Sequence, residues 1–163
     1  MLFTFQRIGL DYAAGAPGQV SVDAIVDAPP AVVFDVLTGD RWPEWFPDML
    51  EMEWIPPRGV GGGRHARLRH SEAYETFLAW EPGTRFAFSV DRSDRPFLKA
   101  LMVDWRLSPA PGGRGTRVEL RWHYTLRAWW RPMQVLVSRA MRKILAAALA
   151  GLKEFTEKQP RAS

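Results

Sequence analysis

A small set of polar side chains within strand-like segments could carry acid–base chemistry. A reaction at an activated carbonyl needs an acid or base beside it and a donor for the developing oxyanion. Arg69, His70 and Tyr124 are the candidates for catalysis, because a His or Tyr with a neighbouring Arg can fill these roles. The polar residues expected in or near strand interiors are Arg67, Arg69, His70, Tyr74, Glu75, Asp104 and Tyr124.

Metal, thiol and phosphate chemistry are not indicated. His65 and His70 are five residues apart on one strand, so their side chains leave opposite faces and cannot easily share a metal ion. His123 lies between Trp122 and Tyr124 and is expected to face outwards. The chain has no cysteine. We therefore expect no metal site and no cofactor.

Two further motifs are also excluded. The glycine-rich stretch 59–63 lacks the Lys-Ser/Thr of a phosphate-binding loop and does not lead into a helix, so it is interpreted as a hairpin turn. A Ser-His-Asp hydrolase is not indicated, because the chain has no nucleophile-elbow signature.

Composition favours one globular domain, spanning 1–163. The chain is 47% hydrophobic and 25% charged, and a chain of this size buries roughly 70% of its unfolded surface. The net charge of +4 comes with 18 Arg and 4 Lys. A basic surface can attract anionic ligands or membranes. The basic residues form no long runs, so nucleic acid is not an expected partner.

The apolar segments are too short for a transmembrane span. The longest run, Ile144–Leu152, is far below the ~20 residues that a bilayer requires. Residues 1–7 lack the basic and apolar regions of a signal peptide. We expect a cytoplasmic protein, monomer or homodimer, with at most transient contact with a membrane.

The C-terminal segment predicts one long amphipathic helix from about Met133 to Lys158. Pro132 lies where a first-turn proline is tolerated. Apolar residues recur there at spacings of three and four, which places them on one helical stripe. The stripe residues are Met133, Val137, Met141, Ile144, Ala148, Leu152 and Phe155. Such a stripe needs a sheet against which to be buried.

Most of the remaining chain has the alternation of strands. A first strand at 19–27 is followed by a short helix at 31–37 and a second helical turn at 40–47. Residues 1–18 form a lead-in, either an arm or an extra strand, and 19–158 form the core. The later strands are expected at 48–55, 64–70, 73–80, 85–90, 97–107 and 117–127. The strand at 73–80 can turn either Tyr74 or Glu75 inwards, and the pattern leaves this open.

This order predicts an α+β fold in which a curved antiparallel sheet of about seven strands wraps around the C-terminal helix. The segments Val20–Leu37 and Arg41–Pro47 resemble the opening of the START-like, Bet v 1-like (SRPBCC) superfamily, in its polyketide cyclase/dehydrase and lipid-transport branch. Ala73–Phe88 resembles the middle hairpin of that group, and Leu149–Phe155 resembles its closing helix. The resemblance implies a helix-grip fold with two short helices after the first strand.

The resemblance and the aromatic content together predict a cavity between sheet and helix that binds a small hydrophobic molecule. A lipid, a polyketide or an aromatic metabolite would fit this description. The expected ligand-binding residues are Trp42, Trp45, Phe46, Tyr74, Phe88, Val103, Trp105, Leu120, Trp122, Tyr124, Val137, Met141, Ile144 and Leu145.

Two alternatives remain open on the sequence. The first is an enzyme of the cyclase/dehydratase type that uses Arg69, His70 or Tyr124 for proton transfer. The second is a protein-interaction module with a filled interior, whose surface Trp and Arg residues contact a partner. An open apolar cavity favours a carrier, an inward Arg or His favours the enzyme, and a filled interior favours the interaction module.

Overall fold

A strongly curved antiparallel sheet forms most of the molecule, in strand order β2-β8-β7-β6-β5-β4-β3. The computed structural model describes residues 1–160. The strands are β2 (Gly18–Val26), β3 (Met49–Ile55), β4 (Gly63–Leu68), β5 (Ser71–Glu81), β6 (Arg85–Ser93), β7 (Leu98–Pro109) and β8 (Thr116–Leu126). Each pair of neighbouring strands in this order is antiparallel, as the hairpin-rich sequence predicts.

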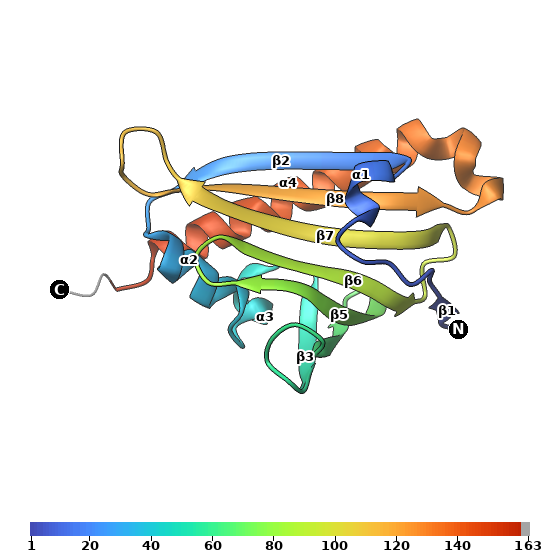
Figure 1. The fold of residues 1–163 in the computed structure, drawn as a ribbon, viewed down its shortest axis with the longest axis horizontal. Helices are drawn as coiled ribbons and strands as arrows, with labels where there is room; N and C mark the ends of the chain where they lie inside the picture. Colours follow the sequence, from blue (N-terminus) through green and yellow to red (C-terminus); the bar gives the residue numbers. More distant parts are fainter. Residues whose placement is uncertain (161–163) are drawn as a thin grey trace.

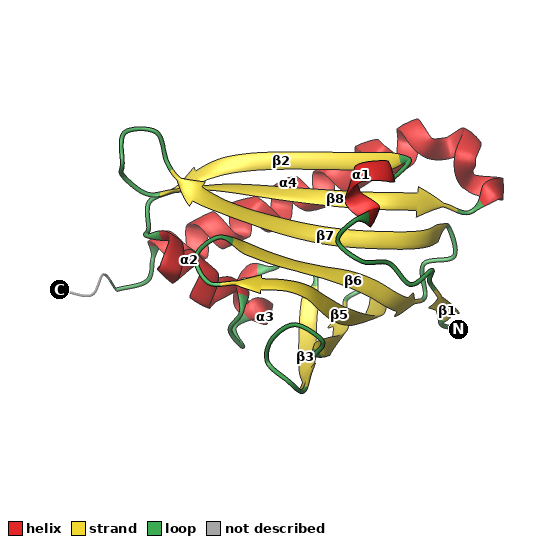
Figure 2. Cartoon of the chain, viewed as in Figure 1, coloured by secondary structure: helices red, strands yellow, loops and turns green. Residues whose placement is uncertain are grey.

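One long helix, α4 (Gln134–Glu157), runs across the concave face of this sheet (Figure 1). A 3-10 helix, η1 (Ala128–Met133), leads into it. Two short helices, α2 (Pro30–Leu37) and α3 (Trp42–Trp45), pack at one end of the sheet. Figure 2 shows this division into one sheet and one helical layer. The predicted α+β helix-grip fold is confirmed.

The buried face of α4 differs in detail from the predicted stripe. Its buried residues are Met141, Leu145, Ala148, Leu149, Leu152 and Thr156. Met133 belongs to η1 and is 42% exposed, so its place in the predicted stripe is wrong. Figure 1 shows why: η1 extends past the ends of the strands, where no sheet lies beneath it.

Residues 1–17 form both a strand and an arm. β1 (Phe3–Thr4) pairs with the end of β6. α1 (Tyr12–Gly15) lies on the convex face, where the Tyr12 hydroxyl is 2.7 Å from the Thr125 hydroxyl. His123 also faces this side, as its alternation predicts, and burial lowers its pKa. It is 3% exposed.

Helix α4 approaches α3 closely at Gly151. A Cβ atom at this position would lie 2.0 Å from the Trp45 carbonyl oxygen. At an unobstructed helix position, Gly→Ala stabilises by about 1 kcal/mol. Here overpacking reverses the sign, and we expect Gly151→Ala to lower the free energy of unfolding by about 1–3 kcal/mol in urea denaturation. A more stable variant would show that the two backbones can separate at little cost.

Candidate ligand-binding site

A cavity of about 170 Å³ lies between the concave face of the sheet, α3 and α4. Its wall is mostly apolar, with side chains from β4 to β8 on one side and from α4 on the other. Asp48, His70 and Ile144 border it and are themselves exposed, so they mark where the cavity meets solvent. A water molecule occupies roughly 10–15 Å³ of such space. The cavity can therefore hold a molecule of about ten non-hydrogen atoms.

Most of the residues predicted to bind a ligand border this cavity. On the sheet they occupy inward positions two residues apart, which is the period of a strand. On α4 they are separated by three residues, as neighbours on one helical face are. These residues are Trp42, Phe46, Phe88, Val103, Trp105, Leu120, Trp122, Met141 and Ile144. The interior is thus not filled, which removes the basis for an interaction module of that kind.

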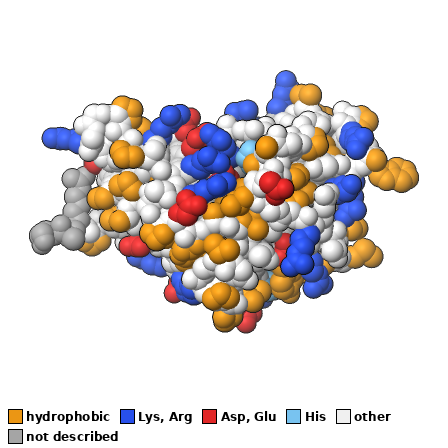
Figure 3. Space-filling view, in the orientation of Figure 1, with side chains coloured by type: hydrophobic (Ala, Val, Ile, Leu, Met, Phe, Trp, Pro, Cys, Tyr) orange, Lys and Arg blue, Asp and Glu red, His pale blue; other side chains and the backbone are white. Residues whose placement is uncertain are grey.

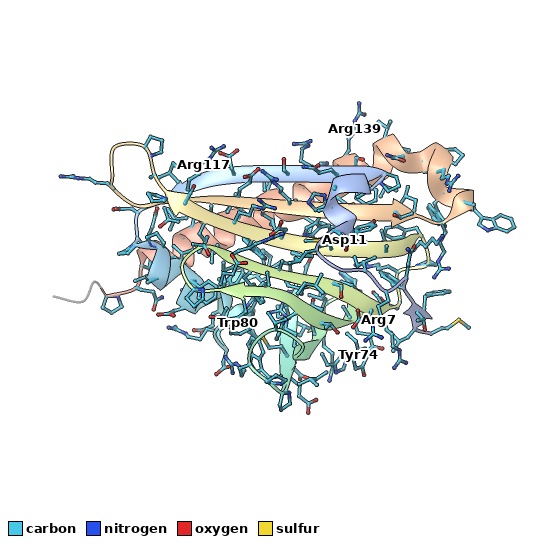
Figure 4. The ribbon with its side chains drawn as sticks, viewed as in Figure 1. Arg7, Asp11, Tyr74, Trp80, Arg117 and Arg139 are labelled. Carbon is cyan, nitrogen blue, oxygen red and sulfur yellow. The ribbon has the colours of Figure 1, made fainter. Side chains whose placement is uncertain are left out.

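Five predicted residues do not border the cavity. Tyr74 lies on the convex face, stacked on His65 with ring centroids 4.2 Å apart (Figure 4). Tyr124 faces inwards, but its hydroxyl is hydrogen-bonded to Ser138 of α4 at the far end of the core. The other three pack against core side chains instead: Trp45, Val137 and Leu145.

The three candidates for catalysis are not brought together. His70 borders the cavity from the turn between β4 and β5, where it is exposed. Arg69 is exposed beside it, and its backbone N–H donates to the Asp48 carbonyl oxygen at 2.8 Å. Tyr124 is occupied by Ser138. The three side chains therefore do not form one group, and His70 is the one of the three that borders the cavity.

The polar centre of the cavity is instead an ion pair between Arg64 and Glu75. The two residues are directly opposite each other on β4 and β5, and both face inwards. Arg64 Nε donates to a carboxylate oxygen of Glu75, and the side chains are 1% and 8% exposed. The guanidinium carbon lies 4.0 Å from the centre of the Trp42 ring and 4.9 Å from that of Phe88. Aromatic faces partly replace the hydration that the buried cation has lost.

Two hydrogen-bond donors at the cavity wall have no acceptor. Arg64 Nη1 and Trp105 Nε1 are buried and lack a hydrogen-bond partner among residues 1–160. Both side chains border the cavity. An unsatisfied buried donor costs about 1–3 kcal/mol, and more when it is charged. Native proteins keep few such groups, and an acceptor on a bound molecule would satisfy them.

Residues 17–157 match the protein family described as polyketide cyclase / dehydrase and lipid transport. The chain belongs to this family. A relative in Mycobacterium tuberculosis, the uncharacterized protein Rv2574, is 28% identical over 116 residues, which are 69% of this chain and 70% of the relative.

Solved structures place the family member in the helix-grip fold. The aromatase/cyclase ZhuI of Streptomyces sp. R1128 has a TM-score of 0.74 at 16% identity, covering 89% of this chain and 96% of that chain. A START superfamily protein of Mycobacterium smegmatis has a TM-score of 0.67 at 16% identity, covering 84% and 97%. Family and fold together indicate a ligand-binding or cyclase-like role.

In this family member, the pKa of the Glu75 carboxyl group depends on its burial and on two charged neighbours. Burial raises the pKa of Glu75, and the neighbouring Arg64 opposes that rise in pKa. Asp91 adds to the rise through its negative charge. The carboxyl group is therefore closer to proton exchange at neutral pH than an exposed glutamate is.

Within residues 1–160, no three His, Asp or Glu side chains are close enough together to hold a metal ion. None of the helices in the same range is both long and apolar enough to cross a bilayer.

Proposed function

We propose that this protein binds a small, largely apolar molecule that carries at least one hydrogen-bond-accepting oxygen. The observation that carries the proposal is Arg64 Nη1, a buried donor without a partner among residues 1–160, at a mostly apolar wall. Burial of the apolar part of the ligand supplies affinity, at about 25 cal/mol per Å² before entropy losses. A hydrogen bond from the guanidinium group fixes the orientation, because charge-assisted bonds are stronger than neutral ones.

The charge of the site favours a neutral oxygen on the ligand. Glu75 already balances the positive charge of Arg64 through their ion pair. A ketone, ester or phenol oxygen can accept from Arg64 Nη1 without adding a buried charge. A carboxylate would add one, and its burial would require Glu75 to take up a proton.

The cavity volume limits the size of the ligand. Pockets for drug-sized ligands typically measure about 300–1,000 Å³, and this one measures about 170 Å³. An aromatic metabolite or a short acyl compound matches that volume. A full-length polyketide chain or an intact phospholipid would need α4 or α3 to move.

Native mass spectrometry of the freshly purified protein, followed by organic extraction, tests this proposal. We expect an added mass that extracts as an apolar, oxygen-containing compound. Val103→Phe places a ring into the cavity and should lower the affinity for that compound about tenfold or more, because the ring occupies space that the ligand needs. Val60→Phe, at a side chain that is 62% exposed, is the matched control. Wild-type protein with no bound mass and no displacement of a hydrophobic dye would contradict the proposal.

A cyclase- or dehydratase-type enzyme is the second candidate. It is favoured by the Glu75 carboxyl group, whose pKa is raised by burial, beside a cation at the cavity wall. Such a pair has the parts for acid–base catalysis and for stabilising an oxyanion. The extracted compound distinguishes the two functions. An unaltered ligand after incubation supports binding alone, and a cyclised or dehydrated product supports the enzyme.

A further inference from the structure

An exposed apolar surface lies where η1 joins α4. We call it the η1–α4 corner; it comprises Trp129, Trp130, Met133, Val135 and Leu136, with the basic residues Arg131, Arg139, Arg142 and Lys143. Trp129 is 91% exposed, Val135 65% and Leu136 55%. Large apolar side chains this exposed, and this close in sequence, mark an interaction site more often than isolated ones do. Figure 1 shows the corner projecting beyond the ends of the strands.

The corner's own charged residues are all basic. From residue 120 to residue 153 the chain has no Asp or Glu, while the same stretch holds seven Arg or Lys residues. Arg139 points outwards from the helix, away from the sheet (Figure 4). The convex face of the sheet is different, because acidic and basic side chains alternate there (Figure 3). Arg117–Asp23 and Arg121–Glu119 are ion pairs of that face.

The corner is continuous with the wall of the cavity. The Trp130 ring packs on Phe97 with ring centroids 5.7 Å apart, and Phe97 borders the cavity. Met141 and Ile144, one to two turns further along α4, border it as well. A surface held against the corner would thus lie beside the residues that line the interior.

We propose that the η1–α4 corner docks onto the surface of an anionic lipid bilayer. Trp and Leu side chains enter the boundary between headgroups and acyl chains, and the Arg and Lys side chains around them bind anionic headgroups. An indole ring is suited to this depth because one edge is apolar and the other carries an N–H. The docking does not depend on which molecule the cavity holds.

A second copy of this chain is a poorer match for the same surface. A two-fold symmetric interface brings identical patches together. It would place the corner's Arg131 and Arg139 against their counterparts, with no carboxylate from residues 120–153 to separate them. Anionic lipid headgroups supply the missing negative charge.

Co-sedimentation with unilamellar vesicles tests the proposal. We expect the full chain to bind vesicles of equal parts phosphatidylcholine and phosphatidylglycerol, and to bind pure phosphatidylcholine vesicles at least about tenfold more weakly. Salt at about 1 M, where the Debye length is ~3 Å, should release most of the protein. The double variants Trp129→Ala/Leu136→Ala and Arg131→Glu/Arg139→Glu should each reduce binding about tenfold or more.

Two matched controls separate the corner from the general basic charge. Arg114→Glu makes the same charge change per substituted residue, in the exposed loop between β7 and β8 at the opposite end of the sheet. Val60→Ala removes an apolar side chain that is 62% exposed in another loop. Both controls should bind the mixed vesicles as wild type does.

Three results would overturn the proposal. The first is the absence of binding to the anionic vesicles at low salt. The second is an equal loss of binding in Arg114→Glu and in the corner variants. The third is a dimer in solution that Trp129→Ala/Leu136→Ala converts to monomer, which would assign the corner to self-association.

Discussion

Arg64→Leu is expected to lower the free energy of unfolding by about 3–5 kcal/mol at pH 7, because it leaves the Glu75 carboxyl group buried without its partner. The ion pair lies within the apolar core, with Arg64 1% exposed and Glu75 8% exposed. Removing one charge of such a pair exposes the full desolvation penalty of the other. Urea denaturation at pH 7 measures the loss.

The stabilities of Arg64→Leu and Glu75→Leu should depend differently on pH. Burial raises the pKa of Glu75, and loss of Arg64 removes the main opposing influence. A carboxyl group whose folded pKa exceeds its unfolded pKa binds more protons when folded. The contribution of Glu75 to the stability of Arg64→Leu is therefore most favourable below the unfolded pKa of about 4.5, and this contribution falls as pH rises towards the folded pKa, by at most ~1.4 kcal/mol per pH unit. Glu75→Leu instead leaves the Arg64 guanidinium group buried without its partner, and this group cannot lose its proton. The cost of burying that charge should therefore be nearly constant from about pH 5 to 8.

Two controls make this prediction specific to the buried pair. Arg64→Leu/Glu75→Leu should recover most of the lost stability, because two apolar side chains leave no buried charge. Arg67→Leu, on the same strand, breaks an exposed pair with Glu51, whose side chain is 65% exposed, and should cost less than about 1 kcal/mol. If Arg64→Leu costs no more than Arg67→Leu, the cavity is hydrated enough to solvate Glu75.

Alternation was sufficient to predict the inward faces of β7 and β8. Leu101, Val103, Trp105 and Leu107 pair with Tyr124, Trp122, Leu120 and Val118, so both apolar sets lie on the concave face. The prediction succeeded because one face of each strand is apolar and the other polar, so only one orientation buries the apolar set.

The same rule could not orient β5. Both faces of this strand include an aromatic residue, and the face with Tyr74 is more apolar by composition than the face with Glu75. The structure buries Glu75 because Arg64 is opposite it on β4, and that pairing is known only once the two strands are in register. The available signal was the two-residue spacing of Arg64, Ala66 and Leu68, which places this Arg on the apolar face of β4.

The face of α4 was ambiguous for a different reason. Residues 144–152 are almost all apolar, so several adjacent stripes bury nearly the same area. The structure buries Leu145 and Leu149, while Ile144 remains 37% exposed at the cavity mouth. The face of α4 that is buried is the one that also allows Gly151 to approach Trp45 of α3. These two residues are over a hundred positions apart in the sequence.

Truncation of Trp105, which borders the cavity, is also expected to cause a large loss of stability. The Trp105 ring packs edge-on against Trp42 and Trp45, at centroid distances of 6.3 and 6.1 Å, and is 1% exposed. Trp105→Ala removes both contacts and creates a void in the core. We expect a loss of about 3–5 kcal/mol in the free energy of unfolding, measured in urea. Trp129→Ala makes the same substitution at a side chain that is 91% exposed and should cost less than about 0.5 kcal/mol.

The void left by Trp105→Ala lies at the cavity wall, so it should also change which molecules bind. Native mass spectrometry of this variant should show bound compounds of higher mass than those in wild type, because the added space accepts a longer apolar part. The variant also loses the indole N–H, which leaves Arg64 Nη1 as the buried unpartnered donor at the wall among residues 1–160. Compounds with one acceptor oxygen should then be retained in preference to those with two. An unchanged set of bound masses would mean that Trp105 does not limit the site, and that the size of the ligand is set between Met141 and Phe88 instead.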